Sequence, residues 1–283
     1  MNASSATAAL VYAYAATPPA PALEHVLPAL TGVAGSPVTL LTLTGPGHGP
    51  AAAFAVSDVP RSEWDEEALK VRFEDLAWLE ETARAHHRVI EELAAHTTVL
   101  PLRLATLYAD RAGALAALRD HGQALATGLA RLSAHTEYGV KLYVRPAVAT
   151  DPSGDARPPA AGASAPRPGA GRAYLQARRA QQHARDDHYA QARTAAERIA
   201  ALAAPHTADH VRHPAQSGPL TASGAGENVL NDAYLVPDAE AEAFRDAVHT
   251  AVRGLSGVRL ELTGPWAPYS FAAPPPPPTG AAP

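Results

Sequence analysis

Large apolar side chains are scarce in this sequence, and they gather in a few short segments. Ala supplies about a quarter of the 283 residues and aromatic residues only 6%, so much of the hydrophobic fraction buries little area per residue. A stable core therefore has to come from dense segments such as 38–43, 98–108 and 228–236. The chain length suits one large domain or two of ordinary size.

The order of apolar and helical segments in residues 1–146 predicts an N-terminal α+β domain with these bounds. A second helical stretch is expected at about 111–134, after a first one that begins near Ser62. The element order is β-β-β-α-β-α-β, which predicts helices on one face of a single sheet. The expected strands are β-branched or aromatic runs at 9–14, 38–43, 52–57, 98–108 and 136–146.

The first helical stretch carries an apolar stripe. Ser62 is a candidate N-cap, because an acidic first turn follows it. The pattern predicts one long amphipathic helix, or two helices with a break near Phe73. The stripe positions are Leu69, Phe73, Leu76, Leu79, Ala83, Ile90 and Leu93.

A stretch of Pro, Ala, Gly, Ser and Arg without hydrophobic period divides the chain at residues 147–171. This composition predicts a flexible linker. Residues 172–272 then predict a second, ferredoxin-like α+β domain with a long helix at 173–204. The proline-rich residues 273–283 are expected to be a disordered tail.

The sequence lacks the signals of common enzyme and cofactor sites. Without Cys it has no thiolate nucleophile, disulfide or iron–sulfur cluster. The glycine-rich segment 44–50 lacks the Lys and Ser/Thr of a phosphate loop. We therefore expect a protein that is not an enzyme, with no catalytic, cofactor-binding or metal site.

Two groups of histidines leave alternatives open. The spacing of His206, His210 and His213 fits either a metal site, if they share a helix, or a solvated loop. His86 and His87 fill a gap in the apolar stripe, so one of them is expected to face the core with a hydrogen-bond partner, the alternative being a buried base.

Charge is unevenly distributed along the chain. Residues 58–81 hold nine acids against three basic residues, whereas residues 145–185 are rich in Arg. The two segments either attract each other across the domain boundary, or the acidic run is a docking face or a solvated helix face. Glu66, Glu67 and Asp75 would contribute to the docking face.

The sequence also predicts the location of the protein. Neither a secretory signal nor a membrane span is evident, and the net charge of −5 disfavours nucleic-acid binding. A cytoplasmic protein is expected.

Several motifs resemble the gas vesicle protein F/L (GvpF/GvpL) family. The resemblance covers about residues 9–146 and 172–272. Its most specific parts are "EDLAWLEETARAHHRVIE", followed by "VLPLR", and the closing "TGPWAPYSF", where Ala267 replaces a usual Pro.

The resemblance implies a non-enzymatic accessory or minor structural protein of the gas vesicle, with two ferredoxin-like modules. Its implied partners are the small hydrophobic shell protein and other accessory proteins, and its role would be to prevent aggregation or aid nucleation of the shell protein. The alternative is a ferredoxin-like small-molecule enzyme or sensor with a His-lined pocket. Trp266, Tyr269 and Phe271 either clamp the chain end onto the body or anchor a partner.

Overall fold

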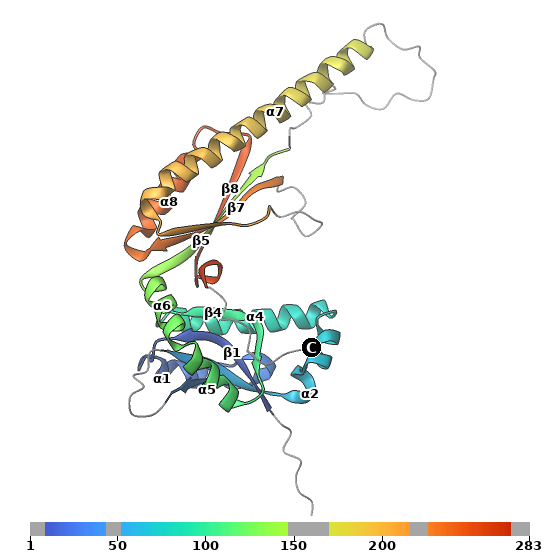
Figure 1. Cartoon of the computed structure of the whole chain (residues 1–283). Helices are drawn as coiled ribbons and strands as arrows, with labels where there is room; N and C mark the ends of the chain where they lie inside the picture. Colours follow the sequence, from blue (N-terminus) through green and yellow to red (C-terminus); the bar gives the residue numbers. More distant parts are fainter. Residues whose placement is uncertain (1–8, 44–51, 147–169, 216–225, 273–283) are drawn as a thin grey trace, which may run out of the picture. The chain divides into compact units, whose positions relative to one another are not determined.

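The computed structural model describes residues 9–43, 52–146, 170–215 and 226–272. The chain divides into two compact units, each built around its own four-stranded sheet (Figure 1). The first unit comprises Met1–Glu137 and Pro265–Pro283, and the second comprises Tyr138–Gly264. The expected α+β fold, with two sheet modules and long helices, is confirmed.

The sheet of the first unit has the strand order β2-β3-β1-β4. The central strand β1 runs antiparallel to both of its neighbours. Pro101 lies in the edge strand β4, where a residue without an N–H is tolerated. The strands are β1 (Ala9–Thr17), β2 (Thr39–Thr42), β3 (Ala53–Pro60) and β4 (Leu100–Tyr108).

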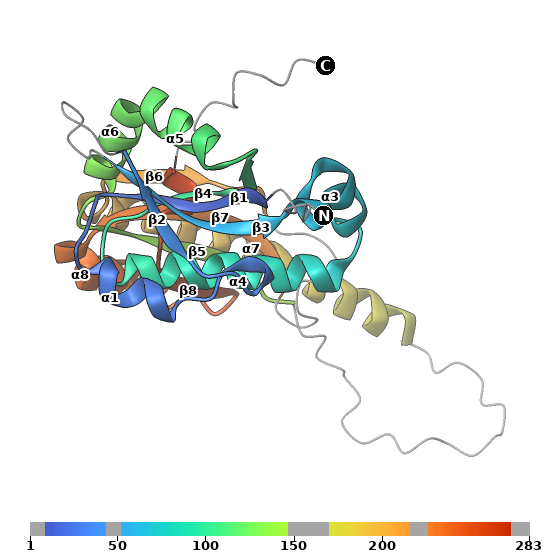
Figure 2. The same cartoon turned by 90° about the horizontal axis from the view of Figure 1, so that it is seen from below.

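Helices cover both faces of this sheet, which is one face more than the sequence predicts. Every residue of β1 after Ala9 is buried. Ala13 and Ala15 are as buried as Tyr12 and Tyr14. The large and small residues of β1 therefore point to opposite faces of the sheet, and both faces are covered. Figure 2 shows α4 (Leu76–Ala94) on one face and α5 (Arg111–Asp120) and α6 (Gly122–Leu132) on the other.

The first helical stretch is broken twice. Asp65 is extended, and its side chain accepts the Ala68 N–H at 2.9 Å, so a new helix begins there. The expected N-cap at Ser62 is therefore wrong, whereas the expected break near Phe73 is confirmed. The helices before α4 are α1 (Leu23–Val26), α2 (Arg61–Trp64) and α3 (Glu66–Arg72), with 3-10 turns at Leu27–Ala29 and Val33–Gly35.

The sheet of the second unit has the order β6-β7-β5-β8. Its core joins Tyr138 and Leu142 of β5 with Ile199 of α7 and with Phe244 and Val248 of α8. The two helices pack against each other. The elements are β5 (His135–Val144), α7 (Ala170–Ala203), β6 (Asp209–Arg212), β7 (Glu227–Pro237), α8 (Ala241–Ala251) and β8 (Val258–Trp266), with 3-10 turns at Ala204–His206, Asp238–Glu240 and Tyr269–Phe271.

The strand expected at 136–146 belongs to this second sheet, although the sequence analysis assigned it to the first domain. It pairs between β7 and β8, and the boundary between the units lies between Glu137 and Tyr138 instead of at residue 146. An alternating pattern predicts a strand, but it does not reveal which sheet the strand joins.

The end of the chain also differs from the expected division. Pro265 and the residues after it group with the first unit, whereas the sequence analysis assigned everything up to 272 to the second. Gly264, with φ +113°, precedes the change of unit. The expected linker lies outside the described residues except for its end, since α7 begins at Ala170, and the expected tail lies outside them entirely.

Phe244→Ala tests the core of the second unit. Its ring is fully buried between Tyr138 and Tyr234, so we expect the free energy of unfolding of this unit to fall by about 3–5 kcal/mol. Chemical denaturation followed by circular dichroism measures it. The control Leu202→Ala, at a side chain 40% exposed, should cost under about 1 kcal/mol.

Candidate partner-binding surfaces

The C-terminal aromatic segment lies on α4 of the first unit. Phe271 is buried, whereas Trp266 is 41% exposed and its ring centroid lies 5.8 Å from that of His87. The Tyr269 hydroxyl lies 3.1 Å from His87 Nδ1. The three aromatic residues therefore differ in burial.

Backbone groups of this segment are held by two carboxylates. Glu137 accepts the Ser270 N–H at 2.8 Å and the Ser270 hydroxyl at 2.7 Å, and Glu91 accepts the Ala267 N–H at 3.2 Å. Burial, with both carboxylates nearby, raises the pKa of Tyr269 far above its usual value. This geometry favours the view that Tyr269 and Phe271 clamp the chain end onto the first unit. Of the three aromatic residues, Trp266 is the one whose ring is exposed.

The acidic candidates have different local roles. Asp75 begins α4, because its Oδ1 accepts the N–H groups of Ala77 at 2.9 Å and Trp78 at 3.2 Å. Glu66 is an exposed residue of α3 in an i,i+4 ion pair with Lys70 at 2.8 Å, which lowers the pKa of Glu66. Glu67 lies in the first turn of the same helix.

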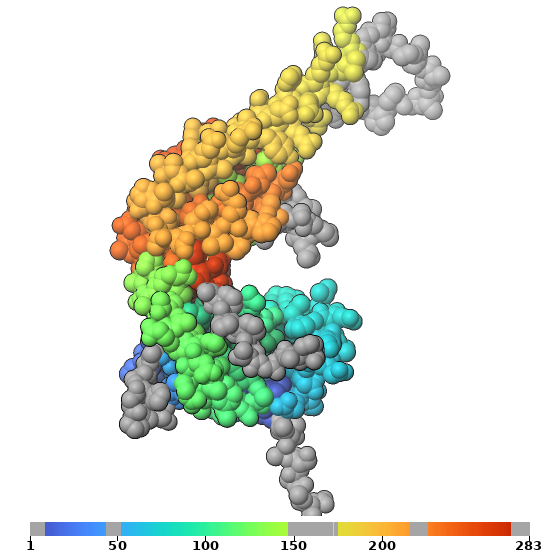
Figure 3. Space-filling model, in the orientation of Figure 1, coloured from blue at the N-terminus to red at the C-terminus, as the bar shows by residue number. Residues whose placement is uncertain are grey.

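Beside these acids the structure exposes three large apolar side chains, which we call the apolar patch. Val71 is 71% exposed, Phe73 44% and Leu76 77%. Phe73 and Leu76 do not share one helix face with the rest of the expected apolar stripe, because α3 ends at Arg72 and α4 begins at Leu76 after its N-cap Asp75. Figure 3 shows α3 and the start of α4, in cyan, on the surface of the first unit.

His86 is the core-facing histidine that the sequence predicts. It is 4% exposed, and its Nδ1 lies 2.9 Å from the Tyr12 hydroxyl, which also accepts the Ala105 N–H. Burial lowers the pKa of His86 to about 4. The ring is therefore neutral at pH 7, and it packs edge-on against Tyr12 at 5.7 Å between ring centroids.

The other histidine group is not brought together as a metal site. His206 Nδ1 lies 2.8 Å from Glu240, whereas His210 Nε2 lies 3.0 Å from the buried Asp232. Their segment forms a 3-10 turn and the edge strand β6, so they do not share a helix. Within residues 9–43, 52–146, 170–215 and 226–272, no group of three His, Asp or Glu side chains is placed to hold a metal ion.

The second unit has a cavity of about 460 Å³ between α7 and β7. Its lining includes Tyr189, Arg193 and His213. Arg212, also in the lining, is engaged by both carboxylate oxygens of Asp232, at 3.0 and 3.1 Å. The expected alternative was a His-lined pocket. This cavity has one histidine, His213, in its lining.

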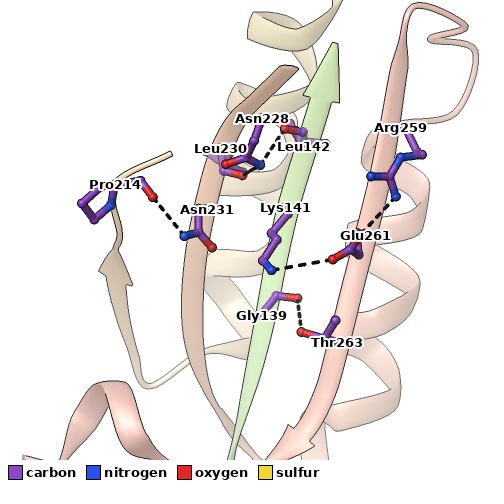
Figure 4. A network of polar contacts seen from close by, with 10 residues as sticks. All are labelled: Gly139, Lys141, Leu142, Pro214, Asn228, Leu230, Asn231, Arg259, Glu261 and Thr263. Atoms are coloured by element: carbon purple, nitrogen blue, oxygen red, sulfur yellow. Dashed lines mark hydrogen bonds and ion pairs between the residues drawn. The ribbon is translucent and has the colours of Figure 1, made fainter. Parts of the chain in front are cut away.

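Polar side chains of the second sheet bind one another (Figure 4). Glu261 of β8 contacts Lys141 of β5 at 3.7 Å and Arg259 at 3.1 Å. Asn228 donates to the carbonyls of Leu142, at 3.1 Å, and Leu230, at 2.8 Å. The Lys141–Glu261 and Asn228–Leu142 contacts join β5 to its two neighbouring strands, so we assign them to holding the sheet together.

The burial of His86 predicts a pH dependence of stability. Its pKa is lower in the folded chain, about 4, than in the unfolded chain, about 6.5. Unfolding therefore takes up a proton, and the free energy of unfolding should fall by about 3 kcal/mol as the pH falls from 6.5 to 4. Denaturation of wild type and His86→Gln across this range should show a smaller fall in the variant, and the exposed control His25→Gln should keep the wild-type slope.

The C-terminal segment predicts a contrast between two aromatic residues. Phe271→Ala should lower the free energy of unfolding by about 3–5 kcal/mol, because the ring is buried. Trp266→Ala should cost much less, about 1 kcal/mol, because much of its ring contacts solvent. Equal losses in thermal denaturation would contradict the division of roles.

No helix in the part of the chain that the structure describes is long and apolar enough to cross a membrane.

Comparison with known proteins connects this architecture to gas vesicles. The family model described as gas vesicle synthesis protein GvpL/GvpF matches residues 10–273. Gas vesicle protein L of Streptomyces sp. (strain CB03234) is 39% identical over 265 residues, which cover 93% of this chain and 92% of that protein.

Two solved structures share the fold. Gas vesicle protein GvpF from Anabaena sp. PCC7120 superposes with a TM-score of 0.59 at 17% identity, covering 94% of this chain and 96% of that one. GvpF from Microcystis aeruginosa gives 0.57 at 17% identity, covering 94% and 100%. The matches to the family model and to gas vesicle protein L, which run along nearly the whole sequence, show that the chain belongs to the GvpL/GvpF family of gas vesicle synthesis proteins.

Proposed function

We propose that the protein is a non-enzymatic accessory or minor structural component of the gas vesicle that binds the small hydrophobic shell protein. It would act in the cytoplasm and at the vesicle, preventing aggregation of the shell protein or aiding its nucleation. Membership of a gas vesicle family supports a role in vesicle formation. The binding step rests on the surface of the first unit.

The apolar patch carries this proposal. Val71, Phe73 and Leu76 are exposed in a chain whose large apolar side chains are scarce and mostly buried. A hydrophobic subunit that is not yet assembled exposes apolar surface and aggregates unless a partner covers it. Exposed apolar side chains on a folded domain supply such cover without any catalytic group.

Trp266 is a second contact candidate. Its exposed ring lies beside His87 on α4, and Trp is a frequent anchor of protein interfaces. Tyr269, through its contact with His87, and the buried Phe271 would hold the segment that carries Trp266 in place. Glu66 and Glu67 would contribute the charged rim of the binding surface, while Asp75 would contribute by setting where α4 begins.

The enzyme or sensor alternative has one favourable observation, the cavity of about 460 Å³ beside His213. Purified protein that binds a small molecule there, with loss of binding in His213→Ala, would support it.

The patch is tested by its ability to keep the shell protein soluble. Phe73→Ser with Leu76→Ser should reduce the suppression of shell-protein aggregation by about tenfold in light scattering, because it removes the exposed apolar area. The matched control is Leu175→Ser with Leu202→Ser, which changes two exposed leucines of the second unit. Full suppression by the patch variant, or equal loss in the control, would overturn the proposal.

A further inference from the structure

The two halves of helix α7 have different surroundings. In the C-terminal half, Ala192, Ala195, Ile199 and Ala203 are buried in the core of the second unit. In the N-terminal half every residue of 175–183 is exposed, and Figure 1 shows this half extending beyond the sheet of its unit. Nine successive exposed residues make about two and a half turns. None of the described elements therefore covers any side of the helix there.

The exposed half of α7 is strongly basic. Residues 170–185 contain four arginines and no Asp or Glu. At 100° per residue these arginines and Leu175, which is 57% exposed, lie within about 140° of arc, and alanines occupy the opposite side. We call this side of the helix the basic face. Its arginines are Arg172, Arg178, Arg179 and Arg185.

Formation of the helix does not account for this charge. The N-terminus of a helix favours acids and disfavours cations, but the first turn of α7 holds no acid and contains Arg172. A helix that is exposed on all sides is normally stabilised by i,i+4 pairs of opposite charge, and residues 170–185 have no acid to form one. A negatively charged partner would offset both effects.

The first unit carries a surface of the opposite charge. Residues 58–81, which include α2, α3 and the start of α4, hold nine acids against three basic residues. Two of these basic residues are already paired with acids, Lys70 with Glu66 at 2.8 Å and Arg72 with Glu63 at 2.9 Å. The remaining acids therefore give this surface a net negative charge.

Two of the remaining acids are available to a partner. Glu67 lies in the first turn of α3, and Glu74 lies in the link between α3 and α4. Both side chains are exposed, and within the part of the chain that the structure describes neither forms an ion pair. Each copy of the protein thus carries a basic face on one unit and an acidic surface on the other.

From these observations we infer that the protein associates with a second copy of itself, and that the basic face of α7 in one copy docks on the acidic surface of α3 and α4 in the other. Complementary charge would steer and orient the two copies. Because the two surfaces differ, the contact is heterologous, and a pair of copies keeps one free surface of each kind. This inference goes beyond the proposed function, which concerns the shell protein.

Sedimentation velocity on the full chain tests the association. In about 10 mM salt, where the Debye length is about 30 Å, the sedimentation coefficient should rise with protein concentration. In about 1 M salt, where this length is about 3 Å, it should stay at the monomer value. A chain that remains monomeric up to about 200 µM in low salt would overturn the inference, because the surfaces would then attract each other too weakly or only within one chain.

Two variants identify the surfaces. Arg172→Gln with Arg179→Gln weakens the basic face, and Glu67→Gln with Glu74→Gln weakens the acidic surface. Each pair of substitutions should raise the dissociation constant of self-association at least about tenfold in low salt. Wild-type association in either folded variant would show that the contact lies elsewhere.

A matched control separates the basic face from net charge. Arg193→Gln with Arg198→Gln removes the same charge from two exposed residues in the C-terminal half of α7. This control should associate as wild type does. A loss equal to that of the Arg172→Gln and Arg179→Gln variant would overturn the assignment of the basic face.

Mixing the two variants gives the sharpest test. Each variant keeps one intact surface, so an equimolar mixture of the arginine variant and the glutamate variant can form the wild-type contact once. The mixture should therefore form one-to-one pairs with the wild-type dissociation constant and no larger species. A mixture that associates no more than the separate variants would overturn the inference.

Discussion

The first unit depends on an aromatic layer between β1 and α4. Tyr12, Tyr14 and Trp64 are almost fully buried there, in a chain with few aromatic residues. The Tyr12 hydroxyl joins His86 of α4 to the Ala105 N–H of β4, and the Tyr14 hydroxyl donates to Ser57 while it accepts the Val33 N–H. Two hydroxyl groups thus tie a helix, two strands and a turn to the central strand, and the rings supply buried area that the many Ala residues cannot.

The same layer leads to the surface that we propose as the binding site. Trp64 contacts Tyr12 on the core side and Trp78 on the outer side, and Trp78 contacts Phe73. Because the helix is interrupted between Arg72 and Leu76, Phe73 does not continue the buried face of α4, and its side chain is exposed. One row of contacting aromatic rings therefore runs from Tyr12 in the core to Phe73 at the surface.

Local features were predictable from the sequence because neighbouring residues cause them. The strand expected at 98–108, the helix break near Phe73 and the burial of one histidine beside the stripe are all present. The buried His86 was predictable because it takes a stripe position on a single continuous helix. The exposure of Leu76 was not, since a periodic pattern assumes a continuous helix and Asp75 begins a new one.

The family motifs indicated gas vesicles, and the match along the chain confirms the family. The candidate surface was only partly predictable. Acids and aromatic residues are visible in the sequence, but which of the apolar side chains meet solvent depends on packing between residues far apart in the chain. Similarly, whether Trp266 or Phe271 meets solvent depends on how the chain end lies on α4.

By itself the sequence determined the α+β class, most strand positions and the family, because backbone propensity, hydrophobic period and motif are local properties. Only the tertiary structure decided that the strand beginning at His135 joins the second sheet, that helices cover both faces of β1, and that Pro265 returns to the first unit. These outcomes depend on which buried surfaces fit each other across long sequence separations. Ala is compatible with both core and surface, and in a chain so rich in it the local pattern leaves those pairings open.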